Sequence, residues 1–228
     1  MRINYLYNSG FMIEADGFDI LVDYYRGNFN PNPGKKLYVL ASHAHGDHYN
    51  KKIWDYNGKN TLYLLSSDIK HKVAGNIIFL TKGDAYEDEN LTLQACGSTD
   101  AGISFLFEIS GETFFHAGDY NYWHWKDEST PEEIKEAEDF FNSELDYIYK
   151  KTQNIDYAFF PLDPRLGEDY WLGADRFIQK IKTSHLIPMH FGENYEKINK
   201  FGERANKCGT RFININKPGT IYDSRAYS

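Results

Sequence analysis

Short apolar runs separated by turn residues dominate the first part of the chain. The segments 2–7, 10–14 and 18–23 each have the length and composition of a β-strand. The Asp16-Gly17 pair between the last two is a strong hairpin signal, because this dipeptide suits a tight two-residue turn. A continuous apolar run at 37–41 then predicts a buried strand. The pattern therefore predicts a chain that opens with a β-meander.

Further strands and a few helices follow from the same pattern. We expect a short helix at 50–56 and strands at the ranges 61–65, 77–80, 91–95, 103–109 and 113–116. Thr130-Pro131-Glu132-Glu133 then combines a capping hydroxyl, a proline at the first helical position and a capping-box glutamate. Apolar residues recur at helical spacing from Ile134 to Ile148. These signals predict a long amphipathic helix.

The last third of the chain alternates strands with helices. Strands are expected at 157–162, 185–189 and 211–215, and helices at 174–182 and 195–208. Two groups of strands, each followed by helices, favour an α+β fold of two sheets with helices outside. No linker or repeat interrupts the pattern, so we expect residues 1–228 to form a single domain.

The densest chemistry follows the strand at 37–41. The segment 42–48 reads Ser-His-Ala-His-Gly-Asp-His, so that His43, His45, Asp47 and His48 lie within six residues. Imidazole and carboxylate groups are the ligands that zinc and its neighbouring metals prefer. The whole chain has only eight histidines, which makes a chance cluster a poor explanation. The segment therefore predicts a metal site.

This segment resembles the H-x-H-x-D-H signature of the metallo-β-lactamase-fold hydrolases. The resemblance implies a four-layer αββα sandwich with the site at one edge between the sheets. It also implies one or two zinc ions, with manganese or iron as alternatives, and a place in the branch of small lactonase-like hydrolases. In this family two further ligands come from distant strand ends. Asp119, in Phe-Phe-His-Ala-Gly-Asp, is similar to the carboxylate that bridges two metals, and His190, in Ile-Pro-Met-His, to the last ligand.

Other residues near these strand ends receive supporting roles. The resemblance implies that Asp23 braces a metal-binding histidine, although an ordinary strand-end acid is the alternative. We expect His116 to orient the site or meet substrate, because on a strand it faces away from its odd-offset neighbours. Trp123 belongs to an aromatic segment, 120–125, that suits either a pocket wall or a core corner. His71, His124 and His185 are assigned no ligand role.

One position departs from the family pattern. Ser98 lies where related chains carry a ligand histidine, so the site of His43 and His45 lacks an imidazole. Asp100 could supply a carboxylate oxygen, Cys96 could supply a thiolate, or this site could be weak or empty. We favour Asp100, because a carboxylate two residues along can reach the site and keeps the charge balance of a dication.

Composition narrows the function. The net charge is -8, so no overall basic field exists to attract nucleic acid. Two cysteines do not make a disulfide framework, and no segment has the length or apolarity of a signal peptide core or a membrane span. We expect a cytoplasmic protein with a small-molecule substrate and no nucleic-acid or membrane partner; the oligomeric state stays open.

The expected activity is hydrolysis of a small ester, lactone or phosphate ester by a metal-activated water, with Asp47 and Asp119 orienting that water. The alternative is a small-molecule sensor that binds metal with little or no catalysis, which the substitution at Ser98 motivates.

Overall fold

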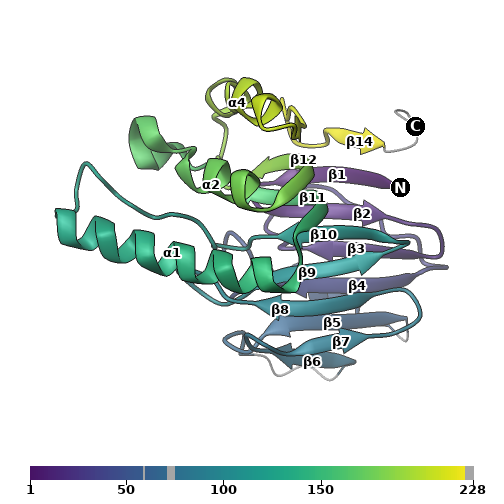
Figure 1. Ribbon diagram of the computed structural model, residues 1–228. Helices are drawn as coiled ribbons and strands as arrows, with labels where there is room; N and C mark the ends of the chain where they lie inside the picture. Colours follow the sequence, from purple (N-terminus) through teal and green to yellow (C-terminus); the bar gives the residue numbers. More distant parts are fainter. Residues whose placement is uncertain (59, 71–74, 224–228) are drawn as a thin grey trace.

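The computed structural model describes residues 1–58, 60–70 and 75–223; His71 lies outside these ranges. The described strands form two sheets that face each other (Figure 1). The first sheet has the order β14 (Ile221–Asp223), β1 (Arg2–Tyr7), β2 (Gly10–Glu14), β3 (Phe18–Val22), β4 (Lys36–Ala41), β5 (Thr61–Ser66) and β6 (Ile77–Leu80). The second sheet has the order β13 (Arg211–Phe212), β12 (Lys182–Met189), β11 (Asn154–Pro161), β10 (Glu112–His116), β9 (Ser104–Ile109), β8 (Thr92–Cys96) and β7 (Ala85–Glu87).

Each sheet is mixed in the same way. In the first, the pairs from β14 to β3 are antiparallel and the pairs from β3 to β6 are parallel. In the second, the pairs from β7 to β10 are antiparallel and the pairs from β10 to β13 are parallel. Each sheet therefore changes from antiparallel to parallel pairing at one strand, β3 or β10.

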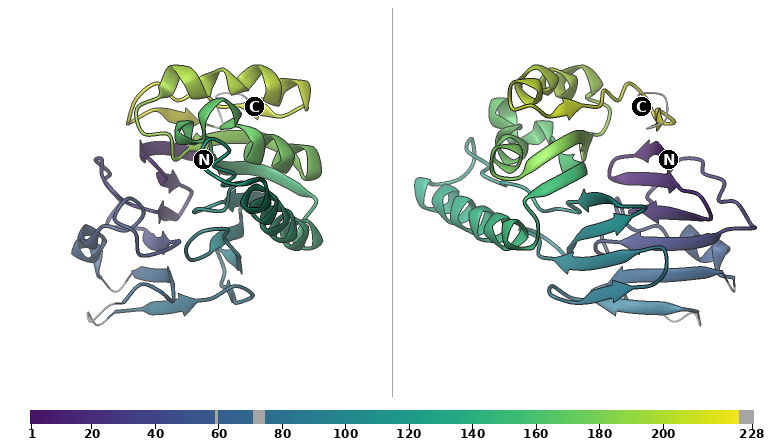
Figure 2. Two further views of the ribbon diagram at one scale, coloured as in Figure 1. Left: turned by 90° about the vertical axis from the view of Figure 1, so that its left-hand side faces the viewer. Right: turned by 45° about the vertical axis from the view of Figure 1, so that its right-hand side comes forward.

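Helices and loops cover the outer faces. Outside the second sheet lie α1 (Pro131–Lys151), α2 (Leu172–Lys180), α3 (Tyr195–Asn199) and α4 (Phe201–Lys207). The left view of Figure 2 shows this layer on one side and the short η1 (Lys51–Tyr56) outside the first sheet. Ile53 of η1 packs in a separate apolar cluster with Val39 and Leu65. The predicted four-layer α+β sandwich is confirmed, with a 3₁₀-helix and loops forming the thinner outer layer.

The main core fills the space between the sheets. Phe11 of β2 and Phe159 of β11 are fully buried, and their ring centroids lie 4.6 Å apart across the two sheets. The same apolar cluster reaches α1 through Phe141 and Ile148. Burial of this kind is the main stabilising term of a domain.

Several local predictions are confirmed. Gly17 has a φ of 89° in the turn between β2 and β3, and Ala15 donates its N–H to the Phe18 carbonyl. Thr130 caps α1 with both halves of the capping box, as its sequence predicted.

Other boundaries differ from the prediction. Lys182 begins β12 instead of ending a helix. The helix expected at 195–208 is interrupted at Lys200. The strand expected at 211–215 is only Arg211–Phe212: the Ile213 N–H still donates to the Leu186 carbonyl, but the Ile215 N–H donates to the Asn199 side chain. The structure also adds a second 3₁₀-helix, η2 (Pro164–Asp169), which the pattern did not predict.

Candidate metal centre

The candidate site lies where parallel strands of both sheets end. β4 leads into the His43–His48 segment, β10 into Asp119 and β12 into His190. The carboxyl ends of parallel strands are the usual place for a ligand site in open α/β sheets. Residues separated by up to 147 positions in the chain are thus brought together at one edge of the sandwich (190 minus 43).

Asp119 is the carboxylate on which the histidines converge. Its Oδ2 lies 3.3 Å from His43 Nε2, and its Oδ1 lies 3.0 Å from His48 Nε2 and 3.6 Å from His190 Nε2. Asp47 completes this arrangement, with its Oδ2 3.6 Å from His190 Nε2 and 3.7 Å from His48 Nε2. The two carboxylates therefore flank the two imidazoles.

Besides the buried group of His43, His48 and Asp119, two further sets of potential donors share this space. In one, Asp47, His48 and His190 bring one ligand atom each to within 4.8 Å of the others. In the other, His45, Asp100 and Asp119 do the same. Asp100 thus lies beside His45 and Asp119. Ser98 instead accepts the Asp100 backbone N–H at 3.3 Å and shapes the turn.

Buried carboxylates hold two of the histidines from behind. Asp23 is fully buried, and its Oδ2 lies 2.8 Å from His48 Nδ1. The same carboxylate accepts both the backbone N–H and the hydroxyl of Ser42 at 2.7 Å. On the other side, Asp163 Oδ2 lies 2.9 Å from His190 Nδ1. Each contact fixes the ring so that Nε2 faces the centre, which is the usual function of a carboxylate behind a ligand histidine.

The backbone is strained at the same place. Asn8, Asp23 and His190 have positive φ values of 54°, 45° and 62°, which residues other than glycine rarely adopt. The Asn8 carbonyl accepts the His190 N–H, and its side-chain amide donates to Asp47 at 3.2 Å. Strain of this kind persists where the surrounding structure enforces it, and it is common at functional sites.

The charges of the site reinforce one another. Burial lowers the pKa of His48, but Asp119 and Asp23 outweigh this effect and raise the pKa to about 10. Burial likewise opposes the increase in the pKa of His190 to about 9, which Asp163 and Asp47 cause. The pKa of Asp119 is lowered to about 2 by the histidines despite its burial. The carboxylates are therefore anionic at neutral pH, whereas His48 and His190 are protonated and would each release a proton on binding a metal.

The donor set fits a divalent metal. His43 Nε2, His48 Nε2 and Asp119 Oδ1 are buried and make no well-oriented hydrogen bond, although the last two lie 3.0 Å apart. Leaving such atoms unpaired costs about 1–3 kcal/mol each, and here they converge on a common space. Nitrogen and oxygen donors in this number suit Zn²⁺, Mn²⁺ or iron, so the residues present are those that would hold the metal.

Comparison with known proteins agrees with this geometry. The family model "Beta-lactamase superfamily domain" matches residues 2–138, which contain the His43–His48 segment and Asp119. The chain belongs to this superfamily. Its fold is similar to that of a solved metallo-β-lactamase-fold protein. None of the curated proteins compared matches the chain.

Solved structures show how widely this fold is shared. Igni18, a metallo hydrolase from the archaeon Ignicoccus hospitalis, is 16% identical, with a TM-score of 0.69 and coverage of 97% of this chain and 98% of that one. The metallo-β-lactamase-fold protein YhfI from Bacillus subtilis is 13% identical, with a TM-score of 0.65 and coverage of 97% and 98%. CmlA from Streptomyces venezuelae, a diiron β-hydroxylase, is 9% identical, with a TM-score of 0.64 and coverage of 94% and 52%. At these identities the likeness establishes the fold alone.

The remaining predicted residues of this superfamily member take supporting positions. His116 is fully buried; its Nε2 lies 2.9 Å from the Ser9 carbonyl, and its Nδ1 accepts the Gly118 N–H. This ring therefore cannot reach substrate and instead supports the loop of Asp119. Cys96 is buried, burial raises the pKa of its thiol to about 12, and it belongs to neither donor set of the described residues.

Residues of the aromatic segment 120–125 lie partly in the wall of a cavity and partly in the core, the two settings that the sequence suggested. Trp123 donates its indole N–H to the Asp119 carbonyl at 2.8 Å and lies edge-on to His190. Tyr120 and Tyr122 are buried in the core, and His124 is buried against the backbone of Asp169. Only the tryptophans of this segment line the cavity described next.

A cavity of about 510 Å³ opens onto the donor sets. This volume suits a metabolite-sized ligand. Its lining consists of His45, Asp47, Thr99, Asp100, Asp119, Trp123, Trp125, Arg165 and His190.

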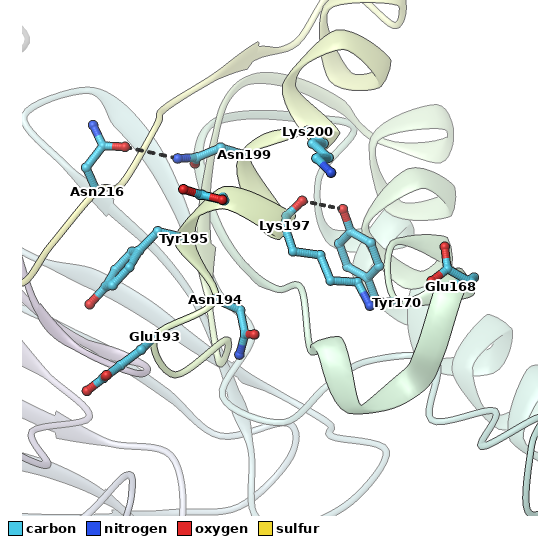
Figure 3. Close-up of a pocket in the computed structure, with 10 residues that line it drawn as sticks. Glu168, Tyr170, Glu193, Asn194, Tyr195, Lys197, Asn199, Lys200 and Asn216 are labelled. Atoms are coloured by element: carbon cyan, nitrogen blue, oxygen red, sulfur yellow. Dashed lines mark hydrogen bonds between the residues drawn. The ribbon is translucent and has the colours of Figure 1, made fainter.

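A larger hollow of about 870 Å³ lies elsewhere, beside α3 and η2 (Figure 3). Tyr170 donates to the Lys197 carbonyl there, and Asn199 donates to Asn216. No member of the two donor sets lines this hollow, so the larger of the two hollows is not the candidate metal site.

Sequence reasoning missed Asn8, Asp163 and Arg165. Asp163 had a usable signal, because an apolar strand runs directly into it, as another does into Asp119. Asn8 and Arg165 had none, since their positions depend on contacts with distant segments. Within the described part of the chain, no helix is both long and apolar enough to cross a bilayer.

Proposed function

We propose that this protein is a metal-dependent hydrolase acting on a small ester, lactone or phosphate ester. The observation that carries the proposal is the convergence of buried, unpaired His43 Nε2, His48 Nε2 and Asp119 Oδ1 on the floor of a metabolite-sized cavity. A cation placed among these atoms would give all three a partner. The superfamily membership supports the same reaction class.

The residues would form two neighbouring metal sites. His43, His45, Asp100 and Asp119 would hold one cation, and Asp47, His48 and His190 would hold a second one beside Asp119. A bound Zn²⁺, Mn²⁺ or iron supplies electrophilic polarisation and makes water a nucleophile near neutral pH. Zinc is our first choice, because the donors are imidazole and carboxylate groups.

Asp47 is placed to handle protons. Its side chain is 44% exposed in the cavity, unlike the buried Asp119. The Asn8 amide holds one carboxylate oxygen, which leaves the other free to orient water or to accept its proton. Asp119 faces the histidines with both oxygens and therefore serves to fix the centre.

Asp100 decides how many metals are bound. If it replaces the missing histidine, the protein binds two metals and the Asp100→Ala variant loses close to one. The matched control is Asp68→Ala, because Asp68 is also close to the histidine segment, where it accepts the Ala44 N–H, but belongs to neither donor set. Metal per chain is measured by plasma mass spectrometry. An unchanged content in Asp100→Ala would remove Asp100 from the ligand set.

The activity itself is tested by reconstitution. Metal-stripped protein is reloaded separately with zinc, manganese or iron(II) and assayed with lactone, thioester and bis-(p-nitrophenyl) phosphate substrates. We expect turnover with at least one metal and a loss of 100-fold or more in Asp47→Asn, the usual size for a lost proton acceptor. Full metal binding with no turnover of any substrate would refute the hydrolase.

That last outcome would favour the sensor instead. The observation behind this alternative is Ser98, which lies where related chains carry a ligand histidine, together with the exposed positions of His45 and Asp100. A sensor would bind a small molecule in the cavity tightly and leave it unchanged.

A further inference from the structure

The cavity contains a cationic side chain that the metal chemistry does not use. Arg165 lies in η2, two residues after Asp163, and its side chain is 63% exposed. It lines the same cavity as Asp47, Asp119 and His190. Among the described residues, Arg165 is the only lysine or arginine in that lining. Any anionic group that enters the cavity would therefore meet this guanidinium or a metal ion bound by the donor sets.

The guanidinium is held in place before any ligand arrives. Arg165 Nε lies 3.0 and 2.9 Å from the two oxygens of Asp163, and Nη2 contacts the second oxygen. The Arg165 backbone N–H also donates to Asp163 at 2.9 Å. Since Asp163 is itself buried, it fixes the arginine while it braces His190. A fixed arginine loses little conformational entropy when it binds a further group.

This geometry leaves donors for a ligand. Arginine has five N–H groups, and the bonds to Asp163 use Nε and Nη2. Nη1 has no hydrogen bond to any residue in the described ranges. A planar guanidinium with free N–H groups is the side chain best suited to carboxylate or phosphate oxygens.

Two tryptophan side chains lie beside the Arg165 guanidinium. Trp123 and Trp125 are stacked, with ring centroids 6.0 Å apart and planes 12° apart, and the Arg165 guanidinium lies 5.7 Å from the Trp125 ring centre. Both tryptophans and Arg165 line the cavity. The lining thus offers an apolar surface together with a fixed cation, which Asp163 connects to His190 of the candidate metal centre.

We propose that Arg165 is a specificity-determining residue that binds an oxyanion, a carboxylate or a phosphate, on a substrate whose apolar or aromatic body lies against Trp123 and Trp125. The proposal rests on the hydrolase function, because it names the substrate class of the same cavity. Asp47, Asp100 and Asp119 line the rest of the cavity, so a second anionic group is disfavoured away from Arg165. The substrate is therefore a molecule with an apolar body and one anionic group that Arg165 binds.

The test is a binding measurement on metal-loaded protein. Isothermal titration calorimetry is performed with phenylacetate, phenyl phosphate and the neutral phenylacetamide. We expect Arg165→Gln to weaken at least one anion tenfold or more, the usual effect of losing a charge-assisted hydrogen bond, and to leave phenylacetamide unchanged. The anion with the larger loss identifies the oxyanion as carboxylate or phosphate.

Two further variants control for indirect effects. Arg176→Gln makes the same charge change at an arginine paired with Glu138, outside the cavity lining, and should leave all three affinities unchanged. Arg165→Lys keeps a cation against Asp163 but loses the planar fork, so we expect an intermediate anion affinity at full metal content. Metal per chain is measured for every variant. If Arg165→Gln loses metal, the anion affinity of Arg165→Lys is compared with that of wild type instead.

The proposal is overturned by any of three results. These are wild-type protein that binds neither anion, phenylacetamide that binds as tightly as phenylacetate, and a fully metallated Arg165 variant with undiminished anion affinity. Kinetics then separate this inference from the hydrolase itself. Equal turnover of 4-nitrophenyl acetate and mono-4-nitrophenyl succinate would support the hydrolase function and refute the anion site. Arg165-dependent anion binding without turnover of any ester would support the anion site and refute the hydrolase function.

Discussion

Asp163 links the candidate metal centre to the substrate cavity through a single side chain. One of its oxygens faces His190 Nδ1, and both face Arg165. Its pKa lies below the usual value, because His190 and Arg165 outweigh the effect of burial, so the carboxylate stays charged at neutral pH. A change at Asp163 should therefore alter both metal affinity and anion recognition.

We predict that Asp163→Ala weakens binding of the metal beside His190 by about 10–100-fold, the usual effect of removing a carboxylate behind a ligand histidine. Asp163→Asn should have a smaller effect, since its amide oxygen can still accept the His190 N–H. Competition against a chromophoric chelator measures the affinity. The control is Asp169→Ala in the same 3₁₀-helix, where Asp169 pairs with the exposed Lys126. An Asp163→Ala protein that competes as well as wild type would show that His190 needs no brace.

Single residues also show what could be predicted from the sequence. His43, His45, Asp47 and His48 were identifiable because their chemistry is concentrated in one short segment. Asn8 was not, although it contacts Asp47, because an asparagine in a turn is common and its role depends on a contact across 39 positions. Arg165 likewise has meaning only beside the cavity.

At the scale of elements, length decided which strands were predictable. β4 has five consecutive apolar residues and β10 has five residues around the buried pair Phe114-Phe115, and both were predicted within one residue of their observed bounds. β7 and β14 have three residues each, too few for periodicity to emerge, and they exist because they pair with β8 and β1. The pairing partner, and not the local sequence, determines such strands.

The loop before β9 lies directly against the histidine segment. Gly102 has a φ of 66°, and a Cβ built on it would lie 2.0 Å from the Ser42 carbonyl oxygen and 2.5 Å from His43 Cβ. The Ile103 N–H also donates to the Ser42 carbonyl. Only glycine allows this approach, so Gly102 fixes the distance between the two segments that carry Asp100 and His43.

We therefore predict that Gly102→Ala lowers the free energy of unfolding by more than about 2 kcal/mol and reduces the metal content. Chemical denaturation of metal-free protein measures the first effect. Gly111→Ala is the matched control, because Gly111 also has a positive φ, 80°, but no atom lies within 4 Å of its built Cβ. Equal losses in the two variants would show that backbone conformation, and not the contact with Ser42, makes glycine necessary.

At the scale of the whole molecule, the site lies where the two sheets change their pairing. β3 and β10 are the strands at which antiparallel pairing becomes parallel, and they end at Asp23 and near Asp119. Asp23 and Asp119 both face His48, one at each ring nitrogen. The two sheets therefore contribute equivalent acids to opposite sides of one imidazole, and the site depends on how firmly the sheets are joined.

A polar cluster joins the sheets at the end of β4 opposite the site. Asp88, in the turn between β7 and β8, accepts hydrogen bonds from Lys36 at 2.6 Å and from the hydroxyls of Tyr38 and Tyr86 at 2.7 Å each. Lys36 and Tyr38 belong to β4 of the first sheet, and Tyr86 belongs to β7 of the second. Burial opposes ionisation of Asp88, but these three donors lower its pKa well below the usual range.

Because the folded-state pKa of Asp88 is depressed, its ionised form stabilises the fold at every pH above its unfolded pKa of about 3.9. That contribution disappears as the pH falls through the folded-state value. We predict that Asp88→Asn lowers the free energy of unfolding by about 1–3 kcal/mol at pH 7. The difference from wild type should stay constant above about pH 5 and shrink below about pH 4.

Urea denaturation between pH 3 and 7 measures both quantities. The exposed pair of Asp146 and Lys180 provides the control, and Asp146→Asn should change stability little at any pH. A gap between wild type and Asp88→Asn that is independent of pH would mean that the carboxylate charge is not what joins the sheets. A gap that shrinks on acidification would tie the rigidity of the sandwich, and with it the distance from Asp23 to Asp119 across His48, to one anion at the opposite end of β4.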